Sequence, residues 1–393
     1  MLTRRKVLQA MGLTAAAGSL PGLVLAKANT DQRLVLVVLR GAVDGLALAA
    51  PYGDGKYRKV RGELALDGPG SQDGVLKLDG MFGLHPSLAN LHDLYDAGEA
   101  LIVHAVASPY RARSHFDGQD LLESGTTRVG AVRDGWLNRS LASLPGTSAI
   151  ALAQNTPLVL RGNIVTSSWA PSRLPDADDS TIGRLQRLYA EDEFFATRLE
   201  QALRAQDIAM DMSDRGQRGN EAQQFGELAS AAARFLTADD GPRVAVLELG
   251  GWDTHANQGA ANGQLANRFA ALDAGLANLQ QGLGDAWDNT VIVVATEFGR
   301  TVEVNGTRGT DHGTATAAVV LGGAVNGGRI VADWPGLGSS NLYEGRDLRP
   351  TTDLRSVFKG VLADHLEIPP GFLDGEVFPD SASAKPLRDL VRG

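Results

Sequence analysis

The sequence predicts an α/β fold with three layers, in which a mostly parallel central sheet lies between two layers of helices. Five continuous apolar runs indicate strands buried on both faces, as in a parallel sheet. These runs are 33–39, 100–106, 243–249, 290–296 and 316–322. Amphipathic helical patterns lie between or after the runs, and strands that alternate with helices favour parallel neighbours.

Apolar residues that recur every three or four positions predict two of the helices. One set is Leu265, Phe269, Leu272, Leu276, Leu279 and Leu283, and the other is Leu354, Val357, Phe358, Val361 and Leu362. A shorter helix is expected in FDGQDLLES, directly after Ser114 and His115. From about residue 160 to 240 the pattern is less regular, with a polar helical run at 180–206. We expect a helical insertion or a cap there.

The N-terminus has the features of an export signal. Residues 3–9 read TRRKVLQ, a modestly apolar stretch follows at 11–26, and Ala26-Lys27-Ala28 forms a small-x-small cleavage site. This resembles a twin-arginine signal peptide, which predicts removal of residues 1–28 and a periplasmic or secreted mature domain at 29–393. A short helix of the mature fold is the alternative, but three glycines and a proline interrupt it. No later segment has the roughly 18 apolar residues that span a membrane.

Charge and composition exclude several classes of function. The formal net charge is −9, and removal of the four basic residues in 1–28 leaves −13. Nucleic acid is therefore not expected as a partner, because phosphate binding needs clustered Lys and Arg. The chain contains no cysteine, which rules out disulfides, thiolate metal ligands and a cysteine nucleophile. Its glycine-rich stretches lack the Lys and Ser or Thr of a phosphate-binding loop.

Ionisable side chains follow or precede nearly every predicted strand. In a parallel sheet, ligands bind beyond the carboxyl ends of the strands, so these positions are candidates for a site. They are Asp44, Ser114 and His115, Asp253 and His255, Glu297, and Asp311 and His312. Several such groups at one sheet edge would repel one another unless a cation or a substrate held them together.

Imidazole and carboxylate ligands without thiolates suit Zn²⁺, Mn²⁺, Ca²⁺ or Mg²⁺. Asp253 and His255 leave a strand two residues apart, so their side chains project to the same side and can share one ion. A satisfied polar turn is the structural alternative for this pair. In GTDHG, Gly309 and Gly313 allow the backbone to approach a ligand closely.

The remaining histidines have simpler interpretations. His104 lies within an apolar run and is expected to be a hydrogen-bonded core residue. His85 precedes Pro86, which favours a structural turn, while His92 and His365 lie on helical faces as surface or packing residues.

A set of motifs in a fixed order resembles a known bacterial family of exported proteins. The motifs are LRGAVDGL, FGLHPSL, SPYRARSHFDGQD, GGWDTH, TEFGRT, GTDHGTA and VLGGAVNGGRIVADWPGL, between about residues 33 and 370. They are similar to the family catalogued as domain of unknown function 1501. That family is in turn remotely similar to the alkaline phosphatase and sulfatase superfamily, which implies an alkaline phosphatase-like fold and metal-dependent hydrolysis of phosphate or sulfate esters.

The resemblance implies roles for individual residues. Ser114 corresponds to the nucleophile at the start of a helix, although an N-cap role is compatible, and His115 is its rival as a ligand or general acid. Asp44 corresponds to a metal ligand after the first strand. Asp253 and His255 match two later ligands, and His312, with Asp311 beside it, matches a final histidine. Glu297 matches an acidic ligand that is normally followed by His, whereas this chain has Phe298.

The mechanism that the resemblance implies uses one or two divalent ions. One ion, bound by Asp253, His255 and His312, would contact the leaving-group oxygen or the transferred group. A second, bound by Asp44 and Glu297, would lower the pKa of the Ser114 hydroxyl. Because Phe298 removes a nitrogen ligand, this second site is weak, takes Ca²⁺ or Mg²⁺, or is unused.

Two further expectations concern the substrate. Arg113 or Arg300 would balance the charge of the transferred group as a guanidinium fork. The substrate is an anionic small molecule or an envelope or extracellular polymer. A formylglycine route is not expected, because the chain has neither a cysteine nor a Ser-x-Pro-x-Arg motif. The alternative to an enzyme is a non-catalytic, metal-bearing binding protein of the cell envelope.

Overall fold

The computed structural model describes residues 30–171, 179–209 and 221–392, so the predicted signal at 1–28 lies outside it. Its main sheet has nine strands in the order β11-β5-β10-β9-β1-β8-β6-β7, with β12 paired to β5. The strands are β1 (Arg33–Leu39), β5 (Ala100–Ala107), β6 (Ala149–Ala151), β7 (Ser167–Ser168), β8 (Val244–Leu249), β9 (Thr290–Thr296), β10 (Thr316–Leu321), β11 (Arg329–Val331) and β12 (Thr352–Asp353). A smaller sheet joins β2 (Ala49–Ala50), β4 (Gly83–Leu84) and β3 (Leu76–Lys77).

One strand of the main sheet runs against all the others. β10 is antiparallel to both of its neighbours, β5 and β9, whereas the other described pairs in this sheet are parallel. The prediction of a mostly parallel sheet is therefore confirmed. Because β10 is reversed, its first residue lies at the same edge as the last residues of β1, β5, β8 and β9. The segment before β10 thus reaches the edge where ligands bind in such sheets.

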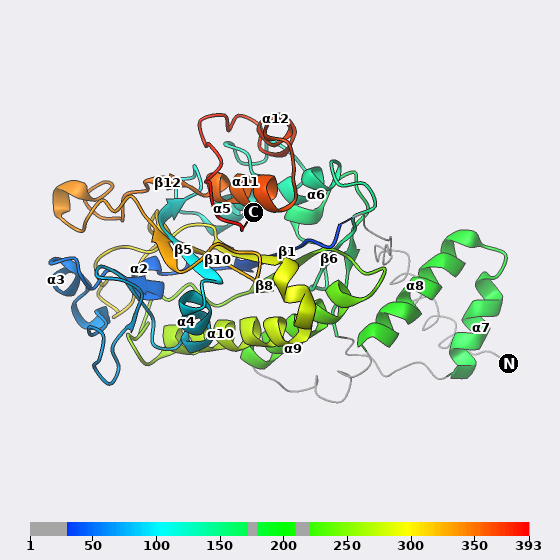
Figure 1. Cartoon of the computed structure of the whole chain (residues 1–393), viewed down its shortest axis with the longest axis horizontal. Coiled ribbons are helices and arrows are strands. Elements are labelled where there is room, and N and C mark those ends of the chain that lie inside the picture. Colours follow the sequence, from blue (N-terminus) through cyan, green and yellow to red (C-terminus); the bar gives the residue numbers. More distant parts are fainter. Residues whose placement is uncertain (1–29, 172–178, 210–220, 393) are drawn as a thin grey trace.

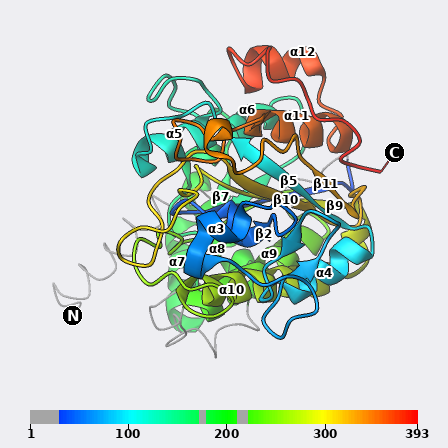
Figure 2. The same cartoon turned by 90° about the vertical axis from the view of Figure 1, so that its left-hand side faces the viewer.

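Helices cover both faces of the main sheet (Figures 1 and 2). They are α2 (Gly45–Leu48), α3 (Tyr57–Arg61), α4 (Ala89–Asp96), α5 (His115–Ser124), α6 (Trp136–Leu141), α7 (Asp179–Tyr189), α8 (Glu193–Ala209), α9 (Glu221–Thr237), α10 (Gln264–Leu283), α11 (Leu354–His365) and α12 (Pro370–Phe372). The layer with α4, α9 and α10 lies on one face, and the layer with α5, α6 and α11 lies on the other.

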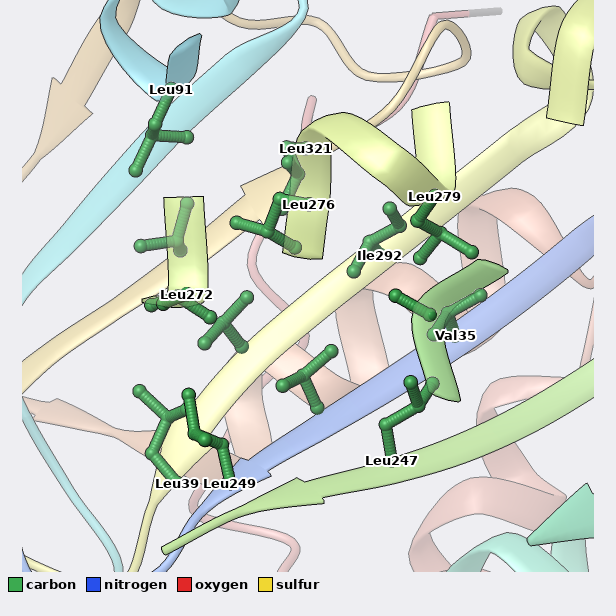
Figure 3. Packing of buried hydrophobic residues seen from close by; sticks show 14 of the residues in the cluster. Val35, Leu39, Leu91, Leu247, Leu249, Leu272, Leu276, Leu279, Ile292 and Leu321 are labelled. Carbon is green, nitrogen blue, oxygen red and sulfur yellow. The ribbon is translucent and has the colours of Figure 1, made fainter. Parts of the chain in front are cut away.

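The side chains of β1 show how the two layers are held. Val35, Val37 and Leu39 point into a core shared with α4, α9 and α10, and Figure 3 shows leucines of α10 packed against the sheet there. The alternate residues, including Leu34 and Leu36, point into a second core with α6 and α11. Both faces of β1 are buried, and its residues from Leu34 to Leu39 are accordingly all apolar. The three-layer prediction is confirmed.

The predicted helical run at 180–206 forms two helices, α7 and α8. They lie at the opposite end of the molecule from α2 and α3 (Figure 1). The next helix, α9, instead packs along α10 and contributes Phe225 and Phe235 to the core. Among the described residues, none of the helices combines the length and apolar character needed to cross a membrane.

The carboxylate of Asp273, in α10, caps the N-terminus of α4. The residue before α4, Leu88, has no side chain that can cap the helix. Asp273 of α10, which is 5% exposed, accepts hydrogen bonds from the backbone N–H groups of Asn90 (3.0 Å) and Leu91 (2.9 Å). Asp273 therefore acts as an N-cap from another helix, and it gives the buried N–H group of Leu91 an acceptor.

Asp273→Ala is expected to lower the free energy of unfolding by about 2 kcal/mol, because it leaves the N–H groups of Asn90 and Leu91, the second of them buried, without their acceptor. Chemical denaturation monitored by circular dichroism measures this change. Asp285→Ala, at an exposed position, is the matched control and should change stability by less than about 0.5 kcal/mol. Equal effects of the two substitutions would contradict the capping role of Asp273.

Candidate metal centre

Five segments bring polar side chains to one edge of the main sheet. Asp44 follows β1, Ser114 and His115 follow β5, Asp253 and His255 follow β8, and Glu297 follows β9. Asp311 and His312 precede the reversed strand β10. The fold therefore gathers residues that are as far apart in sequence as His115 and His312, which are separated by 197 positions.

Three imidazole rings converge on the carboxylate of Asp253. His312 Nε2 lies 2.9 Å from His115 Nε2 and 3.0 Å from His255 Nε2. Asp253 Oδ1 is 3.0 Å from His255 Nε2 and 3.2 Å from His312 Nε2, and Asp253 Oδ2 is 3.5 Å from His115 Nε2. We call these four residues the three-histidine cluster. Ligand atoms of His115, Asp253 and His312 all lie within 4.8 Å of one another, as at a metal site.

A separate acceptor anchors the far edge of each ring. His115 Nδ1 lies 2.7 Å from Glu297 Oε1, and His255 Nδ1 lies 3.2 Å from Asp311 Oδ1. His312 Nδ1 lies 2.9 Å from the backbone carbonyl oxygen of Arg113. Because ionised carboxylates and carbonyls only accept hydrogen bonds, each Nδ1 carries the proton and donates. In the neutral rings, all three Nε2 lone pairs therefore face the centre of the cluster.

Close backbone packing places two of these rings. An isolated bridge pairs Arg300 with His312, and a Cβ on Gly313 would lie 2.4 Å from the carbonyl carbon of Arg300. A Cβ on Gly309 would lie 2.4 Å from the carbonyl group of His255. Neither position has room for a side chain. The glycines of GTDHG thus allow their segment to lie directly against the backbone of Arg300 and of His255.

Arg300 fixes the carboxylate at the centre of the cluster. Its guanidinium is almost fully buried, donates from Nη1 to Asp253 Oδ1 at 2.6 Å, and donates from Nε to Thr310 Oγ1 at 3.1 Å. Burial alone would raise the pKa of Asp253, but the hydrogen bond and charge of Arg300 outweigh it and lower that pKa. Asp253 is therefore held as an anion.

Glu297 is a fully buried anchor for His115. Its Oε1 accepts from the N–H of Gly41 (2.9 Å) and from His115, and its Oε2 accepts from Thr296 Oγ1 (2.9 Å). Burial opposes ionisation, but these hydrogen bonds, led by that of His115, lower the pKa of Glu297. The hydrogen bond to Glu297 in turn raises the pKa of His115.

Phe298 supplies an apolar wall to the cluster. The ring centroid of this buried residue is 5.0 Å from that of His115 and 5.4 Å from that of His312. The aromatic side chain at this position therefore packs against two of the imidazoles. Burial, followed by the charge of His115, lowers the pKa of His312, which favours the neutral ring.

Asp44 lies apart from the cluster, in a buried ion pair. Its Oδ2 contacts the guanidinium of Arg61 and accepts from Gln258 Nε2 at 2.7 Å, while its Oδ1 accepts from the N–H of Leu46. Sequence reasoning missed Arg61 and Gln258. The Asp44 side chain is 1% exposed.

Arg113 and Ser114 have other partners too. The guanidinium of Arg113 donates to Asp347 Oδ2 (2.9 Å) and to Glu344 Oε2 (2.6 Å). The backbone of Arg113 is left-handed, with φ of 62°, and its carbonyl oxygen is the acceptor that anchors His312. Ser114 precedes the first residue of α5 but makes no side-chain capping bond. Its backbone N–H donates to the phenol oxygen of Tyr110 at 3.1 Å.

The other buried histidines are structural. His85, His104 and His365 each donate from Nε2 to a backbone carbonyl oxygen, that of Ala260, Ala49 and Arg33, respectively. Burial lowers the pKa of each to about 4, so all three are neutral. The expected core role of His104 is confirmed.

The family model described as "Protein of unknown function (DUF1501)" matches residues 31–371. This chain belongs to the DUF1501 family. The family resemblance predicted from the motifs is thereby confirmed. A search of curated proteins found no match to the DUF1501 chain.

Several solved structures are similar to the DUF1501 chain at low identity. Phosphonate monoester hydrolase of Agrobacterium radiobacter is 12% identical, with a TM-score of 0.41 over 86% of this chain and 74% of that chain. A protein in the alkaline phosphatase superfamily from Vibrio parahaemolyticus is 11% identical, with a TM-score of 0.37 over 82% and 69%. The C-terminal periplasmic domain of EcEptC from Escherichia coli, in complex with Zn, is 10% identical, with a TM-score of 0.39 over 77% of each chain. Because these TM-scores are below 0.5, the function of the DUF1501 site is inferred from its own residues.

Glu297→Gln in the DUF1501 protein is expected to lower the pKa of His115 towards about 6.5, because the variant removes the anion that raises it. An NMR titration of the histidine rings, with a chelator present, measures this shift. Folding raises the pKa of His115, so its stabilising interaction is complete below about pH 6.5 and is lost as the pH rises through the raised value. The stability difference between the wild type and the variant should accordingly be larger near pH 6 than near pH 9.

Asp311→Asn is the matched control for this titration, because Asp311 anchors His255 rather than His115. It should leave the pKa of His115 unchanged. A His115 pKa that is the same in the wild type and in Glu297→Gln would show that the two side chains are not paired in solution.

Proposed function

We propose that this chain is an exported, metal-dependent hydrolase of phosphate or sulfate esters. The observation that carries the proposal is the three-histidine cluster, in which three Nε2 atoms and one carboxylate face a common centre. Histidines that bind metals usually donate their other ring N–H to a carboxylate or a carbonyl. All three rings of the cluster are anchored in this way.

The donor set of the cluster fits a divalent cation. Three imidazole nitrogens with one carboxylate favour Zn²⁺ or Mn²⁺ over Ca²⁺ and Mg²⁺, which prefer oxygen ligands. His115, His255, His312 and Asp253 would hold the ion. The side chains of His255 and Asp253 are 45% and 43% exposed, so an ion and an anionic ligand can reach them from solvent. When bound, such an ion supplies positive charge that stabilises negative charge developing on an ester oxygen.

Ser114 is the proposed nucleophile because of its place in the chain. It immediately precedes His115 and stands at the N-terminus of α5, where backbone N–H groups favour an anion. Its hydroxyl is not used to cap the helix. The neighbouring phenol of Tyr110 donates to Asp117 Oδ2 at 3.1 Å, which orients the phenol oxygen that Ser114 contacts.

The substrate class and the cellular location belong to the same proposal. The remote similarity of the DUF1501 family to the alkaline phosphatase and sulfatase superfamily supports a phosphate or sulfate ester, carried by a small molecule or by a polymer. The paired arginines at residues 4 and 5 and the cleavage site at 26–28 support export by the twin-arginine route. A mature net charge of −13 is consistent with a soluble extracytoplasmic protein that does not bind nucleic acid.

The second candidate is a metal-bearing binding protein of the cell envelope. One observation favours it: both arginines that were expected to bind the transferred group have partners within the protein. Arg113 is paired with Asp347 and Glu344, and Arg300 with Asp253. An anionic group bound at the cluster would then be neutralised by the cation alone, which suits reversible binding.

His312→Ala is expected to weaken Zn²⁺ binding more than about 100-fold, because the ring is in contact with every other member of the cluster. Isothermal titration calorimetry on the metal-free mature protein measures the affinity. His92→Ala, on the partly exposed face of α4, is the matched control and should bind like the wild type. Equal loss in both variants, or no binding by the wild type, would reject the proposed metal centre.

Ser114→Ala is expected to lower the kcat for an aryl phosphate, phosphodiester or sulfate ester by at least about 1,000-fold while leaving the metal content unchanged. Release of 4-nitrophenol from the three corresponding esters measures turnover. Ser340→Ala, at an exposed position, serves as the control. Full turnover in Ser114→Ala would exclude this nucleophile, and an absence of turnover by the metal-loaded wild type would favour the binding protein.

A further inference from the structure

The carboxylate of Asp44 is fully engaged within the protein. Arg61 and Asp44 are 0% and 1% exposed, and the Nη2 group of Arg61 contacts Asp44 Oδ2. The same oxygen accepts from Gln258 Nε2 at 2.7 Å, and Oδ1 accepts from the N–H of Leu46 at 3.1 Å. Both oxygens therefore already have donors.

The guanidinium of Arg61 occupies a position surrounded by oxygen atoms. Besides Asp44 Oδ2, it contacts two backbone carbonyls, from Nη1 to Thr301 O (3.3 Å) and to Val302 O (3.2 Å). One carboxylate and two carbonyls form the kind of ligand set that hard divalent cations take. The positive charge at this position comes from a side chain of α3.

Both carboxylate oxygens of Glu297 likewise already accept hydrogen bonds from donors within the protein. Its Oε1 accepts from Gly41, His115 and Gln119, and its Oε2 accepts from Thr296. A cation shared by Asp44 and Glu297 would have to displace Arg61 from one carboxylate and His115 from the other. Each displacement would leave a buried charge without its partner, which is strongly unfavourable.

We propose that Arg61 is a resident cation that takes the place of a second metal ion, so that the three-histidine cluster is the single cation site at this edge of the sheet. Asp44 is then a partner of Arg61 rather than a metal ligand. This inference rests on the proposed function, because it assumes that the cluster binds an ion. It replaces the expectation of a second ion on Asp44 and Glu297.

The charges of the site agree with a single divalent ion. The carboxylates of Asp44, Asp253, Glu297 and Asp311 carry four negative charges, and the guanidiniums of Arg61 and Arg300 carry two positive charges. With the three histidines neutral, one divalent ion brings this group of side chains to neutrality. A second ion would leave an excess of positive charge at a largely buried position.

The test is a count of bound ions in the wild type and in the double variant Asp44→Asn with Arg61→Met. The double variant removes both charges together, so neither is left buried without a partner. Elemental analysis after equilibration with Zn²⁺ or Mn²⁺ gives the number of ions per chain, and calorimetry gives the affinity. We expect one ion per chain in both proteins, with Kd values that differ by less than about tenfold.

The outcomes separate this inference from the proposed function. Two ions in the wild type, with one lost in the double variant, would make Asp44 a metal ligand and overturn the role of Arg61, while the cluster would stand. One ion that is kept in His312→Ala but lost in the double variant would move the site to Asp44 and overturn both proposals. No ion in the wild type would reject the proposed metal function itself.

Discussion

Three imidazole nitrogens and a carboxylate that face one centre repel one another, and the surrounding chain keeps them together by anchoring the opposite edge of each ring. The anchors come from three separate places: Glu297 after β9, Asp311 before β10, and the carbonyl of Arg113 before α5. Only a sheet in which β10 runs backwards brings the segment with Asp311 and His312 to this edge. The direction of one strand therefore decides whether the cluster can exist.

The contacts of Phe298 give a physical reason for an aromatic residue at the position where a histidine was expected. The aromatic ring lies against His115 and His312, on the buried side of the cluster. An apolar wall lowers the local dielectric constant, which strengthens the hydrogen bonds that orient the rings. Glu297, next to it in sequence, is correspondingly an anchor for a histidine. Of these two adjacent residues, Phe298 packs against two rings of the cluster and Glu297 accepts a hydrogen bond from one of them.

The sequence was sufficient for most of the fold and for part of the site. Long apolar runs identified β1, β5, β8, β9 and β10 within a residue or so, whereas β6, β7, β11 and β12 have only two or three residues and carry no readable period. Strand ends identified the members of the cluster. Their grouping, and the pairing of Asp44 with Arg61, depend on tertiary contacts. Arg61 lies 17 residues from Asp44, on a five-residue helix with no motif to mark it.

The long separations within the cluster make cation affinity a property of the folded chain. His115 is 182 residues from its anchor Glu297, and of the four cluster residues an unfolded chain keeps only Asp253 and His255 as close neighbours. A ligand that binds the folded state and not the unfolded state shifts the folding equilibrium by mass action. At a free ion concentration one hundred times the Kd, that shift is about 2.7 kcal/mol. An ion bound at this edge would therefore stabilise only the state in which the strands of the sheet have assembled.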